Sequence, residues 1–107
     1  MPGETSTDVD ALALLPLPDV NRLSRPQTEG TICVWCGSGL IPYTARDLGA
    51  RPCRRGGQIF PRGCGSCVRA QAARVYAIHV TQCGHCLRNT PCADRTALRH
   101  LASEGRS

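Results

Sequence analysis

Three cysteine pairs of the form Cys-x-x-Cys decide the fold, and they lie in two stretches: CVWCG at residues 33–37 and CGSCVRAQAARVYAIHVTQCGHC at residues 64–86. A Cys-x-x-Cys turn places two thiolates on one side of a tight loop. Two such turns, or one turn with two further ligands, surround a tetrahedral metal ion. The chain has 8 cysteines, and the two outside these pairs are Cys53 and Cys92. The cysteine spacing therefore predicts more than one metal site.

The rest of the composition explains why metal is needed. The chain has 107 residues with one Trp, one Phe and two Tyr. Leu, Ile, Val and Phe make up about a fifth of it, near the level at which an apolar core alone stops being sufficient. Domains this small usually add disulfides or structural metal. The length excludes a large enzyme fold, and we expect the metal-free module not to hold its fold.

Charge divides the sequence into two parts. Residues 1–30 hold five acidic residues and two arginines, whereas residues 31–107 hold eleven arginines and three acidic residues. We expect residues 1–30 to form an acidic, disordered leader, and residues 31–107 to form a basic module with two metal sites. As an alternative, the leucines of the leader dock on a partner. The use of arginine without any lysine suggests a high-GC coding genome of the actinobacterial type.

The leader does not have the pattern of a targeting signal. Its apolar run at residues 11–17 follows acidic residues and is interrupted by Pro16. No stretch is long enough to span a bilayer. We therefore expect a cytoplasmic protein without a membrane partner. Thiols stay reduced in the cytoplasm, where paired cysteines bind metal more often than they form disulfides.

The first two cysteine pairs fit one site. Gly37 follows the first pair, where a zinc knuckle must turn sharply. Apolar runs at residues 40–43 and 58–60 predict a distorted β-hairpin, and a helix over 66–81 follows the second pair. The apolar stripe of this helix consists of Val68, Ala72, Val75 and His79. This order of knuckle, hairpin and ligand-bearing helix resembles the treble-clef class of zinc fingers. The resemblance implies a small α+β domain stabilised by zinc.

The second site begins where that helix ends. His79 and Cys83 are four residues apart and share a helix face, and Cys86 and Cys92 follow. The Thr-Pro pair at residues 90–91 predicts the start of a last helix that runs to about residue 104, with Gly105 as its stop. This predicts a second zinc knuckle and a C-terminal helix. The alternative for His79 is an ordinary half-buried helix residue.

The predicted ligands thus form two sets, each for one zinc ion. Cys53, in a stretch expected to be the hairpin tip, is left over as a free thiol or a substitute ligand. The first set is Cys33, Cys36, Cys64 and Cys67, and the second is His79, Cys83, Cys86 and Cys92.

Two other interpretations use the same cysteines. Cys83, Cys86 and Cys92, followed by a helix, resemble the cluster-binding segment of WhiB-like iron–sulfur regulators, which implies an iron–sulfur cluster with Cys64 or Cys67 as a further ligand. The Gly and Trp-rich turn of that family is missing here. The sequence Cys-Gly-His-Cys at residues 83–86 is also that of the protein disulfide isomerase active site, but no βαβ pattern surrounds it.

No catalytic constellation is present, so we expect a binding protein without a small-molecule substrate. The first hypothesis is a transcription-associated regulator that binds nucleic acid. The alternatives are an adaptor for a protein such as one of the transcription machinery, with structural zinc, and a redox-responsive iron–sulfur regulator. The candidate nucleic-acid contacts are Arg51, Arg54, Arg55, Arg62, Arg69 and Arg74.

Overall fold

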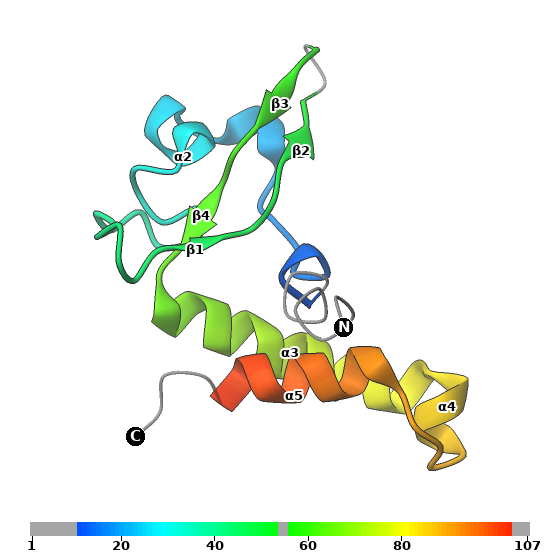
Figure 1. Ribbon diagram of the computed structural model, residues 1–107. Helices are drawn as coiled ribbons and strands as arrows, with labels where there is room; N and C mark the ends of the chain where they lie inside the picture. The colour runs from blue at the N-terminus through cyan, green and yellow to red at the C-terminus, as the bar shows by residue number, and fades with distance from the viewer. Residues whose placement is uncertain (1–10, 54–55, 104–107) are drawn as a thin grey trace, which may run out of the picture. The chain divides into compact units, whose positions relative to one another are not determined.

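The structure, a computed structural model, describes residues 11–53 and 56–103 (Figure 1). Its chain contacts divide these residues into two compact units. We call Pro16–Cys67 the knuckle–hairpin unit. Residues 11–15 together with 68–103 form the helical unit. The boundary falls within a single helix, so one element contributes residues to both units.

The knuckle–hairpin unit contains short helices followed by an irregular β-hairpin. Strand β1 pairs antiparallel with β4, and β2 pairs antiparallel with β3. Between these two short ladders the Leu48 N–H donates to the carbonyl of Pro61 at 3.1 Å, so the segments run on as one hairpin. The elements are η1 Val20–Arg22, α2 Arg25–Glu29, β1 Arg46–Asp47, β2 Arg51–Pro52, β3 Gln58–Ile59 and β4 Arg62–Gly63.

The hairpin predicted from sequence is present, but its first strand was placed too early. Residues 40–43 contain no strand; they lead into a turn in which the N–H groups of Thr44 and Ala45 both donate to the carbonyl of Ile41. Pro42 has no N–H to give to a ladder, which favours a turn at this position. The first strand begins only at Arg46.

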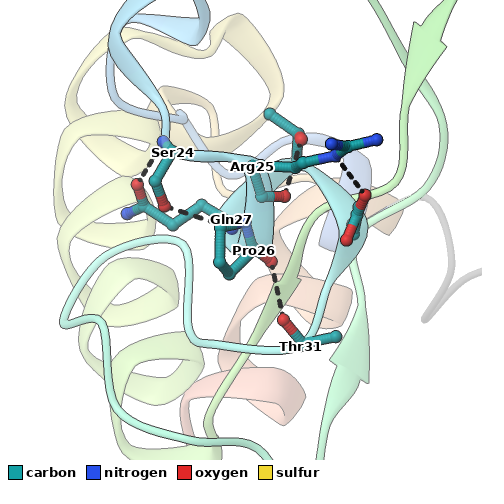
Figure 2. Close-up of polar contacts among 7 residues, drawn as sticks. Ser24, Arg25, Pro26, Gln27 and Thr31 are labelled. Carbon is teal, nitrogen blue, oxygen red and sulfur yellow. Dashed lines mark hydrogen bonds and ion pairs between the residues drawn. The ribbon is translucent and has the colours of Figure 1, made fainter.

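Helix α2 is short and fixed at both ends (Figure 2). The Ser24 hydroxyl accepts from the Gln27 N–H at 3.4 Å, and the Gln27 side chain accepts from the Ser24 N–H at 2.8 Å. This reciprocal pair is a capping box. The helix ends at Gly30, whose φ of +79° is the left-handed conformation that glycine adopts most readily.

The helical unit contains α3 from Val68 onward, α4 and α5, together with residues 11–13, which are also helical. Helices α3 and α5 run antiparallel and are joined through α4 (Figure 1). The predicted helix over 66–81 corresponds to α3, which spans Gly65–Gln82; α4 is Gly84–Leu87 and α5 is Ala93–Ser103. The buried apolar side chains of this unit are Ala11, Leu12, Leu15, Val68, Ala72, Ala97, Leu98 and Leu101.

The expected disorder of residues 1–30 differs from the structure over residues 11–30. Leu12 and Leu15 are buried, and backbone and side-chain hydrogen bonds join α2 to the knuckle and the hairpin within its own unit. Two of the leader's leucines therefore contribute to a core of this chain, which is the physical reason for the difference. Residues 1–10 of the predicted leader lie outside the described residues.

The last helix also differs in detail from its prediction. It starts at Ala93, so that Cys92 occupies the N-cap and the predicted Thr-Pro start lies outside the helix. The predicted stop at Gly105 lies beyond the described residues. Among the described residues, no helix combines the length and the apolar character needed to cross a bilayer.

Candidate metal centres

The first cluster begins with a knuckle formed by residues 32–39. An isolated bridge joins Ile32 to Gly39, and the Cys33 N–H donates to the Ser38 carbonyl at 2.8 Å. The Gly37 N–H returns to the Cys33 carbonyl at 2.9 Å, and Gly37 has a φ of +76°. The predicted glycine turn is therefore confirmed, and it orients both thiols of the knuckle towards one point.

The second half of this cluster lies where the hairpin meets α3. Cys64 directly follows β4, and Cys67 is in the first turn of α3. The Val34 N–H donates to the carbonyl of Arg62 at 3.0 Å, which holds the knuckle against β4. The knuckle therefore contributes two thiols to the cluster, and the junction of β4 with α3 contributes the other two.

The four sulfur atoms have the spacing of a mononuclear site. All four lie within 4.8 Å of one another, and the Sγ atoms of Cys36 and Cys64 are 3.9 Å apart. A tetrahedral zinc ion with Zn–S bonds of about 2.3 Å has ligand sulfurs roughly 3.8 Å apart, whereas a disulfide needs about 2.05 Å. The separation fits four thiolates around one ion and excludes a bond between the Cys36 and Cys64 sulfurs.

Hydrogen bonds reach the sulfur atoms of this cluster, and at Cys36 they favour the thiolate, the form that binds metal. Cys33 is fully buried, and its Sγ accepts from the N–H groups of Cys36 and Cys64 at 3.5 Å each. The hydroxyl and N–H of Ser38 lower the pKa of Cys36 to about 6. Burial, followed by the neighbouring thiols, raises the pKa of Cys67. One metal ion of charge +2 would compensate this crowded group of sulfurs.

The second cluster is built on the end of α3. The Cys83 N–H donates to the His79 carbonyl at 2.8 Å, so the helical turn that places both side chains on one face is complete. The Leu87 N–H then donates to the Cys83 carbonyl at 2.9 Å, as the Gly37 N–H does to Cys33 in the first knuckle. The predicted helix-face pairing of His79 with Cys83 agrees with this geometry.

Cys92 completes the cluster from the N-cap of α5. Its carbonyl accepts from the Thr96 N–H at 3.2 Å, and its Sγ accepts from the Arg95 N–H at 3.5 Å. The sulfur thus takes the place of a capping oxygen, where the free amides and the helix dipole favour negative charge. The sequence-based prediction put Cys92 two positions deeper, in the first turn of the helix, and did not anticipate this capping role.

The distances of the second cluster also fit one ion. Nε2 of His79 is 3.3 Å from Sγ of Cys92, and the sulfurs of Cys83 and Cys92 are 3.9 Å apart. The backbone N–H of Cys86 lowers the pKa of Cys83, whereas burial raises the pKa of Cys86. All four residues are partly exposed, and their donor atoms lie within 4.8 Å of one another.

The structure therefore brings together all eight predicted ligands, in the two predicted groups. The WhiB-like interpretation needed either Cys64 or Cys67 as a further ligand of the second group, but both lie in the first group. Each group offers four donors, four thiols in the first and three thiols with an imidazole in the second, and the spacing of each would suit a single tetrahedral metal ion.

Cys53 belongs to neither cluster. It lies at the hairpin tip, where its N–H donates to the Gly57 carbonyl at 3.1 Å and its carbonyl accepts from the Gly56 N–H at 2.9 Å. Its side chain lines a cavity of about 320 Å³ whose other walls come from η1, α2 and their flanks. The predicted place at the tip is correct, and among the described residues Cys53 joins no group of three or more possible metal ligands.

The predicted nucleic-acid residues are distributed over both units. Arg51 is half buried, and its guanidinium donates from Nε at 3.2 Å and from Nη2 at 3.1 Å to the Leu48 carbonyl. This contact holds the arginine against its own hairpin. Arg62 and Arg74 are exposed, and Arg69 is partly exposed. Residues 54–55, which include two predicted contacts, lie outside the described residues.

Residues 16–30 support the first cluster through contacts that were not predicted from the sequence. Nε2 of Gln27 donates to the Val34 carbonyl at 3.0 Å, inside the knuckle. The indole N–H of Trp35 donates to the Pro16 carbonyl at 3.1 Å, and the Phe60 N–H donates to the Thr28 carbonyl at 2.9 Å. The signal was present as Ser-Arg-Pro-Gln at residues 24–27, a capping-box pattern with proline in the first turn.

Comparisons with protein-family models, with curated proteins and with solved structures found no match for this chain. The geometry of the two clusters thus carries the functional argument, and the resemblance to treble-clef fingers stays a prediction.

Proposed function

We propose that this protein is a nucleic-acid-binding, transcription-associated regulator whose fold depends on two structural zinc ions. The observation that carries the zinc proposal is the pair of four-donor clusters, each with the spacing of one tetrahedral ion. Four protein ligands fill the coordination sphere of zinc and leave no position for a substrate or a reactive water. Such sites stabilise a fold, and we therefore propose binding rather than catalysis.

Zinc is favoured over an iron–sulfur cluster by donor type and spacing. Iron–sulfur clusters are held mainly by four cysteines, whereas the second group contains His79. A cluster of several irons also lies between its ligands and separates them more widely than a single ion does. Sulfur atoms 3.9 Å apart, as in Cys83 and Cys92, suit the single ion. An elemental analysis separates these outcomes directly.

Redox catalysis by Cys83 and Cys86 is not supported by their surroundings. In the thioredoxin fold a reactive Cys-x-x-Cys follows a strand. Here the pair follows the end of α3, and both sulfurs lie in a group with His79 and Cys92. Their role as metal ligands accounts for the same four-letter sequence.

Charge supports nucleic acid as the ligand. The thiolates of the two clusters outweigh the charge of two zinc ions, but eleven arginines against three acidic residues keep residues 31–107 basic. Helix α3 contains no Asp or Glu. Its exposed positions include Arg74 among small side chains, Ala70, Ala73 and Ala77. Small residues let a helix approach a phosphate backbone closely, and Arg74 would then contact a phosphate.

The test is the salt dependence of binding, with one arginine removed at a time. The assay is fluorescence anisotropy with labelled duplex DNA and single-stranded RNA, at roughly 50 to 300 mM KCl. The logarithm of the binding constant should fall linearly with the logarithm of the salt concentration. Arg74→Ala should weaken binding and reduce the slope by about 1. The control is Arg22→Ala, which removes the same charge from an arginine already paired with Asp19 at 3.9 Å. Equal effects of both variants, or an affinity that does not depend on salt, would show that the exposed face of α3 around Arg74 does not bind nucleic acid.

A protein adaptor is the second candidate, and one observation favours it. The turn after the knuckle exposes Ile41 by 60% and Tyr43 by 96%, and residues 37–45 carry no charge. Exposed apolar turns with tyrosine are common contact points in protein interfaces. Binding of a purified transcription protein that persists at high salt and is lost in Tyr43→Ser, without any affinity for nucleic acid, would favour the adaptor.

A further inference from the structure

Helix α3 carries or adjoins ligands of both metal clusters. Cys67 is in its first turn and His79 is in its last turns. Cys64 directly precedes the helix, and Cys83 directly follows it. Four of the eight predicted ligands therefore depend on one helix of 18 residues for their placement.

The sequence of α3 gives the helix little stability of its own. Val68, Val75, Ile78, Val80 and Thr81 are β-branched, and such residues lose side-chain freedom in a helix. The helix has no acidic residue, so no ion pair forms between its own turns. Isolated helices of this length are marginal in water.

Packing also supports α3 unevenly. Its two buried residues, Val68 and Ala72, are both in its first half, and the described second half has none. The stripe continues through Val75 and His79, which are partly exposed. Burial therefore supports the second half less than the first, and a metal ion at His79 and Cys83 would fix it at its end.

We propose that the two clusters bind zinc cooperatively, because each ion orders the same helix for the other. This inference rests on the proposed pair of zinc sites and adds a regulation to it: partial zinc supply yields fully loaded and empty chains instead of singly loaded ones. The unfavourable free energy of ordering α3 reduces the affinity of whichever ion binds first. The second ion binds to a helix that is already ordered. Binding at one site should raise affinity at the other by about 5–150-fold, the usual range for coupled sites.

The test counts metal ions on each chain during a zinc titration. Full-length protein, reduced and stripped with a chelator, is titrated with zinc alone and observed by native mass spectrometry. Two independent sites give about half or more singly loaded chains at half saturation, and positive coupling lowers that share. We expect zero-ion and two-ion chains to dominate. A singly loaded share of half or more would overturn the inference.

Substitutions at Ala73 test whether α3 transmits the coupling, since this residue is exposed in the middle of the helix. Ala73→Gly weakens the helix without dividing it, so more of its ordering falls to the first ion and the coupling should rise by up to about fivefold. Ala73→Pro interrupts the helix between the clusters, so the singly loaded share should rise to at least that of independent sites. Ala102→Gly, in the last turn of α5, makes the same substitution outside α3 and should leave the distribution unchanged.

Each outcome points to one conclusion. Equal effects of Ala73→Gly and Ala102→Gly would mean that coupling follows overall stability, and the role of α3 would be wrong. If Ala73→Pro fails to fold with zinc, the distributions of zinc ions per chain in the wild type and in Ala73→Gly still test whether α3 transmits the coupling. Protein that binds no zinc at all would instead refute the proposed zinc sites, so failure of the coupling and failure of the sites are distinguishable.

Discussion

Replacing Gly30 by alanine should strongly destabilise the knuckle–hairpin unit. Gly30 ends α2 with a φ of +79°, which side-chain-bearing residues rarely adopt. A Cβ atom at this position would lie 2.8 Å from the carbonyl oxygen of Phe60 and 3.0 Å from Cγ of Arg62. The Phe60 oxygen belongs to the backbone beside β3, so a side-chain rotation cannot relieve that contact.

The magnitude follows from two separable costs. The left-handed backbone costs an alanine about 1–2 kcal/mol, and overpacking a well-filled position typically costs a further 1–3 kcal/mol. We therefore expect Gly30→Ala to lower the free energy of unfolding by about 2–5 kcal/mol. Gly49 has a φ of +86° with open space around it, so Gly49→Ala should show the first cost alone. Gly39 has neither feature, and Gly39→Ala should be near neutral.

The assay is thermal and denaturant unfolding of the zinc-loaded protein at one fixed concentration of free zinc, because bound metal shifts apparent stability. The expected order of stability is Gly39→Ala, then Gly49→Ala, then Gly30→Ala. For a domain of this size 1 kcal/mol corresponds to about 4–8 °C in Tm. If Gly30→Ala melts with the wild type, α2 does not pack against the hairpin, and residues 16–30 are a disordered leader after all.

Further predictions concern the cysteines. Cys64→Ser and Cys83→Ser should each bind fewer than two zinc ions and lose the cooperative melting transition, because structural zinc contributes on the order of 10 kcal/mol; unchanged metal content and Tm would contradict the two clusters. Cys53→Ser should leave both quantities unchanged, since Cys53 lies in neither cluster, and a lost zinc ion would make it a ligand. Zinc binding to the unfolded, metal-free chain at pH 7 should release about seven protons, one for each clustered thiol, because unfolded thiols are mostly protonated at that pH. Calorimetry in buffers of different ionisation enthalpy measures this number, and a value of eight would mean that an eighth thiol binds in place of His79.

The metal clusters were the most predictable part of this protein. The covalent geometry of a Cys-x-x-Cys turn is enough to place its two thiols close together. Helical periodicity then places His79 and Cys83 on the same face of the helix. The helix between the clusters was predictable for the same reason, within one residue at each end. In both cases the signal is local, so no knowledge of distant contacts is needed.

The contacts of residues 11–30 were less predictable because they depend on tertiary packing. A run of leucines after acidic residues has the same sequence pattern whether it binds a partner or the chain's own helices, and burial of Leu12 and Leu15 decides between these only in three dimensions. The position of the first hairpin strand was missed because the four strands are only two residues each, and such short strands leave almost no periodic signal.

The most direct test of the account is the metal content of protein purified without oxygen and without added metal. Elemental analysis with an absorbance spectrum should give two zinc ions per chain and no visible colour, because zinc has a filled d shell. Iron with a brown charge-transfer band would make the second group an iron–sulfur site. Fewer than two metal ions on folded protein would contradict the central claim that both clusters are structural metal sites.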